Sequence, residues 1–189
     1  MMQAGKWVRG SAVFSRCGRY RYVLRREWDS SRDAVLFIGL NPSTADARRD
    51  DPTIRRCIGF ARSWGYGAVI VANLFAFRAT DPAKLKVAGD PVGPRNDRWL
   101  ARLRGEAGMT VAAWGVHGKL RSRDEEFLAE GGELYCLGRT KGGCPRHPLY
   151  LRGDAGVVRF APRAMVRCKT RGASPAAKGK SRRWKSVAG

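Results

Sequence analysis

Three short, largely apolar runs do most to limit what this chain can fold into. They are Ala34–Leu40, Ala68–Leu74 and Met109–Trp114. Runs that do not alternate with polar residues are typical of strands buried on both faces, as in the centre of a parallel sheet. Segments with helical spacing separate them, so the pattern predicts an α/β protein with helices on both faces of its sheet.

The remaining elements are weaker but fit the same plan. Asp51 followed by Pro52 is a helix start, and Gly65 ends the helical spacing that follows. The whole predicts a three-layer αβα domain with a central, largely parallel four-stranded sheet and N-terminal edge strands. The further helices expected are 96–104 and 119–128, the fourth strand is 133–137, and the edge strands fall within 12–28. The last ordered feature expected is 156–160.

Composition changes near the C-terminus. Residues 1–160 are expected to form the α/β domain, whereas residues 161–189 contain nine Lys and Arg and no acidic residue. This segment has no apolar periodicity, so it is predicted to be a disordered basic tail. Its functional interpretation is an arm that grips phosphates, and its alternative is a solubilising appendage.

The charge of the chain points to an anionic partner. Lys and Arg number 37 against 16 Asp and Glu, a formal net charge of +21. Nucleic acid is the usual polyanion for such a protein, and no apolar run is long enough to favour a membrane. Residues 1–10 lack the apolar stretch that is typical of a secretory signal, and the five cysteines form no C-x-x-C pair. We therefore expect a cytoplasmic monomer that binds DNA and needs no metal or other cofactor.

Two loops and one strand end hold the candidate site residues. Gly39–Asp46 follows the first buried strand, where Gly permits close approach of a ligand and Asn41 could orient water or a base edge. An ordinary Asx-type turn explains the same residues equally well.

His147 lies between two prolines in a basic loop, which favours a functional histidine over a structural one, whereas His117 is interpreted as incidental. Asn73 is a lone amide in an apolar strand, suited to capping backbone or to reading a base.

These strand ends, taken in order, resemble the uracil-DNA glycosylase superfamily. Gly39-Leu40-Asn41-Pro42 is similar to its first motif, Val71-Ala72-Asn73-Leu74 to its pyrimidine-reading strand, and His147-Pro148 to the start of its DNA-intercalating loop. Ala113-Trp114-Gly115 is similar to the strand before that loop. A closer resemblance, to a bacterial family catalogued only as a domain of unknown function, rests on N-P-S-T-A-D, D-D-P-T and P-R-H-P-L-Y-L.

The resemblance implies a monofunctional DNA N-glycosylase that flips uracil out of DNA, cleaves its glycosidic bond and leaves an abasic site. The catalytic residues it implies are Asn41, His147 and Asp46. Substrate binding is expected of Gly39, Leu40, Pro42, Ser43 and Asn73. DNA binding is expected of Arg146, Leu149, Tyr150, Leu151 and Arg152.

Some positions depart from the superfamily pattern. Asn41 stands where the most active branch has a water-activating Asp, and Asp46, Asp50 and Asp51 lie near it in the sequence. Two alternatives remain open. One is a non-catalytic module that binds uracil or abasic DNA, and the other is an enzyme that acts on another modified base or on a nucleotide.

Overall fold

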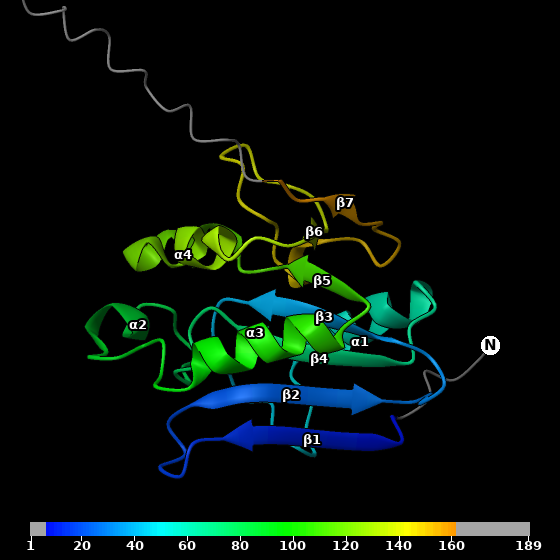
Figure 1. Cartoon of the computed structure of the whole chain (residues 1–189), viewed down its shortest axis with the longest axis horizontal. Coiled ribbons are helices and arrows are strands. Elements are labelled where there is room, and N and C mark those ends of the chain that lie inside the picture. The colour runs from blue at the N-terminus through cyan, green and yellow to red at the C-terminus, as the bar shows by residue number, and fades with distance from the viewer. Residues whose placement is uncertain (1–6, 162–189) are drawn as a thin grey trace, which may run out of the picture.

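A single seven-stranded sheet organises the molecule (Figure 1). The computed structural model describes residues 7–161, so all but the first residue of the expected basic tail lies outside the described residues. The order of the strands across the sheet is β1-β2-β4-β3-β5-β6-β7. Their bounds are β1 Arg9–Phe14, β2 Arg21–Glu27, β3 Ala34–Gly39, β4 Ala68–Asn73, β5 Met109–Ala112, β6 Tyr135–Cys136 and β7 Val158–Arg159.

The sheet is mixed. Strand β3 runs parallel to both β4 and β5, and β5 runs parallel to β6. The outer pairs β1–β2, β2–β4 and β6–β7 are antiparallel. The prediction of an α/β protein is confirmed. The sheet is mixed and has seven strands, because the N-terminal hairpin and the short β7 join it by antiparallel pairing.

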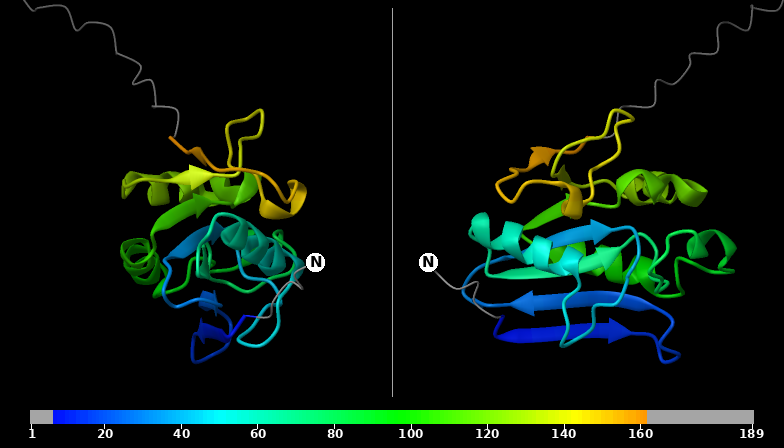
Figure 2. Two further views of the ribbon diagram at one scale, coloured as in Figure 1. Left: turned by 90° about the vertical axis from the view of Figure 1, so that its right-hand side faces the viewer. Right: turned by 180° about the vertical axis from the view of Figure 1, so that it is seen from behind.

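Helices cover both faces of the sheet, as Figure 2 shows in its left panel. Helix α1 packs on one face, while α3 and α4 pack on the other. The helices are α1 Pro52–Ser63, α2 Lys84–Val87, α3 Asn96–Glu106 and α4 Arg123–Ala129, with the 3-10 segments η1 Gly115–Ser122 and η2 Pro148–Tyr150. The short α2 falls within the connection between β4 and α3.

Burial on two faces explains the apolar runs. Along β3, Leu36 and Ile38 belong to the core that packs against α3, whereas Val35 and Phe37 belong to the core that packs against α1. Successive side chains of a strand point to opposite faces, so both sets must be apolar. All six residues of β4 are buried for the same reason. The two-sided core therefore holds the ends of β3 and β4 in place.

The N-terminal segment, in which edge strands were expected, forms a hairpin. Strand β1 pairs with β2 around a turn in which Gly18 has a φ of 69°. Only β1 lies at the sheet edge, because β2 also pairs with β4. Because β2 is an interior strand, two of its arginines, Arg21 and Arg26, are buried. The prediction of N-terminal edge strands is therefore confirmed for β1, whereas β2 is an interior strand.

Helix boundaries follow local chemistry. Asp51 caps α1 by accepting a hydrogen bond from the backbone N–H of Ile54 at 2.9 Å, and Pro52 occupies the first turn. The helix expected from Lys119 is shorter than predicted. Arg121 and Ser122 both have positive φ, which separates η1 from α4.

Candidate functional site

A pocket of about 680 Å³ opens where the parallel strands β3, β4 and β5 end. Its walls come from the loops after these strands, the N-terminal turn of α1 and the segment around η2. Its buried lining includes Phe37, Val71 and Cys57, which belong to the core on the α1 face. Ligands of open α/β sheets bind at this edge, and the volume suits a small molecule or a single nucleotide base.

Asn73, the last residue of β4, lies in the wall of this pocket and has an unpaired side-chain donor. Its side chain lines the pocket and is 3% exposed. Its Nδ2 has no hydrogen-bond partner within residues 7–161. The backbone carbonyl of Asn73 accepts a hydrogen bond from Asn96 Nδ2 at 2.9 Å, which holds the strand end. Buried amide groups normally have partners, so this donor is available to an acceptor on a ligand.

Gly39 ends β3 directly beside Asn73. The two residues are paired in the parallel register, and a Cβ atom at position 39 would lie 2.7 Å from Asn73 Oδ1. Real Cβ atoms essentially never come this close to another heavy atom. Glycine at this position therefore makes room for the Asn73 amide.

Asn41 joins two of the loops that form the pocket. Its Nδ2 donates to the carbonyl of Ala79 at 2.7 Å and to that of Pro42 at 3.1 Å. The Pro42 carbonyl also accepts from the N–H of Ala79 at 2.9 Å. The amide nitrogen of Asn41 thus connects the loop after β3 to the loop after β4. Its Oδ1 is the side-chain atom left to contact a ligand or water.

His147 reaches the pocket from the segment before η2. Its Nδ1 accepts a hydrogen bond from the N–H of Leu149 at 3.4 Å, so the neutral ring carries its proton on Nε2. Burial lowers the pKa of His147 below its ordinary value of 6.5, and the nearby charge of Asp51 opposes this shift. At neutral pH the site therefore holds an uncharged imidazole with Nε2–H as its free donor.

The three aspartates after Asn41 have different environments. Asp46 is not part of the pocket lining: its Oδ1 accepts from the N–H groups of Arg48 and Arg49 at 2.8 and 2.9 Å. These hydrogen bonds lower the pKa of Asp46. Asp50 pairs with Arg26 at 2.8 Å. Asp51 alone lines the pocket, which corrects the prediction that Asp46 acts there.

Arg21 is a buried cation in the pocket wall that sequence analysis missed. It is 2% exposed, and its Nη1 donates to the carbonyl of Ala45 at 2.8 Å. Its Nε has no hydrogen-bond partner among the described residues. Burial lowers the pKa of Arg21 to about 10, with the charge of Asp51 acting in the opposite direction. No sequence signal distinguished this arginine from the other basic residues of the N-terminal strands.

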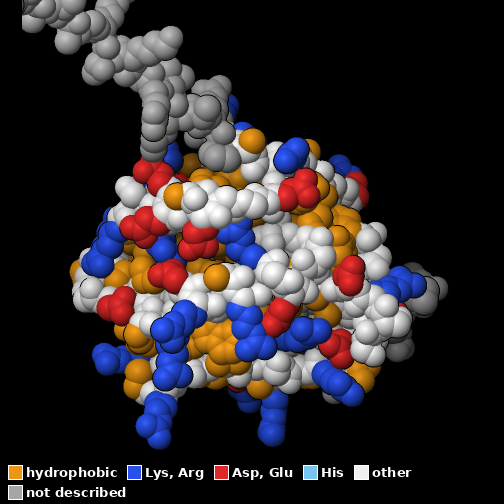
Figure 3. Space-filling model, in the orientation of Figure 1, with side chains coloured by type: hydrophobic (Ala, Val, Ile, Leu, Met, Phe, Trp, Pro, Cys, Tyr) orange, Lys and Arg blue, Asp and Glu red, His pale blue; other side chains and the backbone are white. Residues whose placement is uncertain are grey.

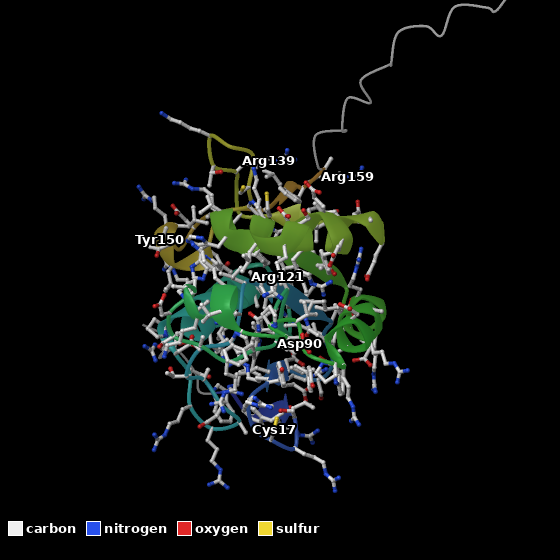
Figure 4. All side chains as sticks on the ribbon, turned by 90° about the vertical axis from the view of Figure 1, so that its left-hand side faces the viewer. Cys17, Asp90, Arg121, Arg139, Tyr150 and Arg159 are labelled. Carbon is white, nitrogen blue, oxygen red and sulfur yellow. The ribbon has the colours of Figure 1, made fainter. Side chains whose placement is uncertain are left out.

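The rim of the pocket carries exposed apolar side chains. Figure 4 views the strand ends, with Tyr150 projecting on the α1 side of the sheet. Tyr150 is 79% exposed and Leu149 is 41% exposed, and both line the pocket. The rings of Tyr150 and His147 lie 5.6 Å apart. Leu151 instead packs against the core, and Arg152 pairs with Asp154 at 3.4 Å, so neither lines the pocket.

The surface carries charges of both signs on the α3 and α4 face, with long basic side chains projecting near β1 and β2 (Figure 3). Within residues 7–161, no group of three or more His, Cys, Asp and Glu side chains is placed to hold a metal ion. No helix in this range is long and apolar enough to cross a membrane. The cysteines Cys17, Cys57, Cys136 and Cys144 are all free thiols.

A family model for proteins of unknown function, DUF1643, matches residues 21–149. The chain belongs to the DUF1643 family. No curated protein matches it, and no solved structure does.

The DUF1643 match contains most of the predicted site. The predicted residues that line the pocket are Gly39, Leu40, Asn41, Ser43, Asn73, Arg146, His147, Leu149 and Tyr150. Those that do not line it are Pro42, Asp46, Leu151 and Arg152. His117, interpreted from the sequence as incidental, also lines it. The DUF1643 match begins at Arg21, so this buried arginine and Leu149 mark its two ends.

Proposed function

We propose that this protein is a uracil-DNA glycosylase-like hydrolase that releases uracil from DNA and leaves an abasic site. The observation that carries the proposal is that Asn73, with a free Nδ2, and His147, with a lowered pKa, face one pocket at the same sheet edge. We further propose that β4, β3, β5 and β6 form the central parallel sheet of a three-layer glycosylase-like fold.

Asn73 would read the flipped base. Its free Nδ2 can donate to the O4 carbonyl of uracil, while its Oδ1 can accept from N3–H. Cytosine carries an amino group at position 4, so it would place a donor against this donor. The pocket volume accommodates a pyrimidine and its sugar.

His147 would stabilise the leaving group. When the bond between C1′ and N1 breaks, its electron pair moves onto the base, and negative charge develops on O2. A neutral imidazole can donate Nε2–H to that oxygen, an oxyanion-hole effect worth about 3 kcal/mol. A protonated imidazole would need a charge that burial at this position disfavours.

Asp51 and Asn41 would hold the attacking water. Asp51 uses Oδ1 to cap α1, which leaves Oδ2 to accept a proton as the water oxygen bonds to C1′. Asn41 Oδ1 would orient the same water. This assignment moves the acidic role from Asp46, which the sequence favoured, to the aspartate that lines the pocket.

The exposed rim suits base flipping. Extrusion of a base costs a few kcal/mol, and an apolar side chain that fills the vacated stack offsets part of this. Leu149 and Tyr150 are exposed beside His147 and would act in this way. Cationic side chains, with a chain charge of +21, would hold the flanking phosphates.

Base release from oligonucleotides tests the proposal. The substrates would contain one uracil, hypoxanthine, mismatched thymine or abasic site, as single and double strands, and would be cleaved by alkali after reaction. We expect the wild type to release uracil, and Asn73→Ala and His147→Gln to slow release by about 100-fold each. Arg16→Gln, an exposed arginine outside the pocket, is the control with normal activity.

The alternatives give different results. A wild type that binds uracil-DNA stably without releasing the base would support the non-catalytic module instead. Release of a different base from the panel would support an enzyme for that modified base. An unchanged rate in His147→Gln would remove His147 from the mechanism.

A further inference from the structure

Two buried arginines of β2 donate hydrogen bonds to the loop that follows β3, but they differ in how many partners their side chains have. Arg26 forms an ion pair with Asp50 at 2.8 Å and donates to the carbonyls of Arg25, Asp46 and Arg49. Arg21 makes one side-chain hydrogen bond within residues 7–161, from Nη1 to the carbonyl of Ala45. Holding the loop therefore explains Arg26 fully and Arg21 only in part.

Arg21 lacks a counter-charge of its own. It forms no ion pair within the described residues, and the one carboxylate that acts on it favourably is that of Asp51, across the pocket lining. A buried cation without a paired anion is costly, and an unpaired buried Nε adds to that cost. Both deficits would be removed by an anion with several acceptor oxygens.

The surroundings of Arg21 favour the same ligand. It lies at the start of β2, and β2 runs antiparallel to β4, so Arg21 occupies the same sheet edge as Asn73. The N-terminal turn of α1, where the helix dipole favours negative charge, lines the pocket together with Arg21 and Arg146. The carboxylate of Asp51 opposes this, but it is a single negative group.

We propose that Arg21 forms an anion subsite in the pocket and binds a phosphate group of the nucleotide whose base Asn73 reads. The identity of the base rests on the proposed function, whereas the need for an anion rests on Arg21 alone. A guanidinium binds phosphate through paired N–H donors, so Nε and Nη2 are the groups that would make the contact. The phosphate has two sources, the terminal monoester of a free nucleotide and the diester beside a flipped nucleotide in DNA.

Calorimetric titrations of the full chain at constant ionic strength test the subsite and its source. The first arm compares deoxyuridine with its 5′-monophosphate. The second compares a uracil-containing oligonucleotide with one in which a neutral methylphosphonate replaces the phosphate 5′ to uracil. In one of these arms we expect the phosphate to strengthen wild-type binding by about 10- to 100-fold. Dependence in the first arm identifies a nucleotide ligand, and dependence in the second identifies DNA.

Three variants assign the effect to Arg21. Arg21→Gln is expected to abolish the gain from phosphate, and Arg21→Lys to retain part of it, because lysine keeps the charge but not the paired donors. Arg16→Gln removes one exposed positive charge and is expected to retain the gain. Thermal unfolding of each variant checks that the fold is intact, and Arg21→Lys serves if Arg21→Gln does not fold.

Two outcomes would overturn the subsite. One is a wild type for which phosphate makes no difference in either arm, and the other is an equal loss in Arg16→Gln, which would indicate general attraction to a cationic chain. Base release is measured separately. A protein that releases uracil without any dependence on Arg21 refutes the subsite and leaves the glycosylase proposal intact. Phosphate binding that depends on Arg21, without base release, supports the subsite and refutes the glycosylase proposal.

Discussion

Replacing Gly39 with alanine would perturb the pocket through one identifiable contact. The new Cβ would lie 2.7 Å from Asn73 Oδ1, whereas ordinary van der Waals contact begins near 3.4 Å. The Asn73 amide must therefore retreat by about 0.7 Å, and a misplacement on the order of 1 Å at a reacting centre costs about 100-fold in rate. Gly39 does not have positive φ, so the backbone itself accepts alanine.

We expect Gly39→Ala to lower kcat/KM for uracil release by about 10- to 100-fold, with a stability change of about 1 kcal/mol. Gly59→Ala is the matched control, because a Cβ at that position in α1 meets no heavy atom within 4 Å. This control is expected to keep full activity and to gain up to about 1 kcal/mol of stability from improved helix propensity.

A double-mutant cycle decides whether Asn73 carries the effect. In an Asn73→Ala background no Oδ1 remains to be displaced, so adding Gly39→Ala is expected to cause little further loss. Losses that simply multiply would refute the reasoning, since they would show that Gly39 acts through another contact. The side-chain amide resonances of Asn73 in 15N-labelled protein provide a readout independent of activity, and they should shift in Gly39→Ala but not in Gly59→Ala.

Three further predictions follow from buried or exposed ionisable groups. Arg26→Met strands Asp50 and should lower the free energy of unfolding in urea by about 3 kcal/mol. Because burial lowers the pKa of His147, its neutral form stabilises the folded state above pH 6.5, and this contribution is lost as pH falls toward the folded pKa. The free energy of unfolding in urea, measured across pH 5 to 8, should therefore fall toward acidic pH, and His147→Gln should reduce that fall. An unchanged pH dependence in His147→Gln would contradict this. Cys17 is exposed and its pKa is lowered to about 7, chiefly by a hydrogen bond from Ser15, so mass spectrometry should find it alkylated by iodoacetamide at pH 7 before the buried Cys57. Faster labelling of Cys57 would show that the pocket wall opens.

Sequence patterns predicted the strands that are buried on both faces, but they did not predict which strands pair with each other. The runs 34–40, 68–74 and 109–114 became β3, β4 and β5 because both faces of these strands are buried. The order of strands across the sheet had no local signal. Nothing in residues 12–28 indicates that β2 will pair with β4, and this pairing converts the expected edge strand into an interior one. All but the first residue of the basic tail lie outside the described residues, so its predicted role stays a prediction.

The residues of the candidate site also fall into those that the sequence predicted and those that it did not. Asn73 and His147 were predicted because a lone amide in an apolar strand and a histidine between prolines are unusual in themselves. Asp46 and Asp51 look equivalent in the sequence, and only the path of the loop decides between them: it turns Asp46 toward the N–H groups of Arg48 and Arg49 and leaves Asp51 at the first turn of α1, facing the pocket. The same loop crosses Arg21 and buries it. A surface arginine and a buried one have the same sequence pattern, so no local pattern could have predicted that Arg21 is buried in the pocket wall.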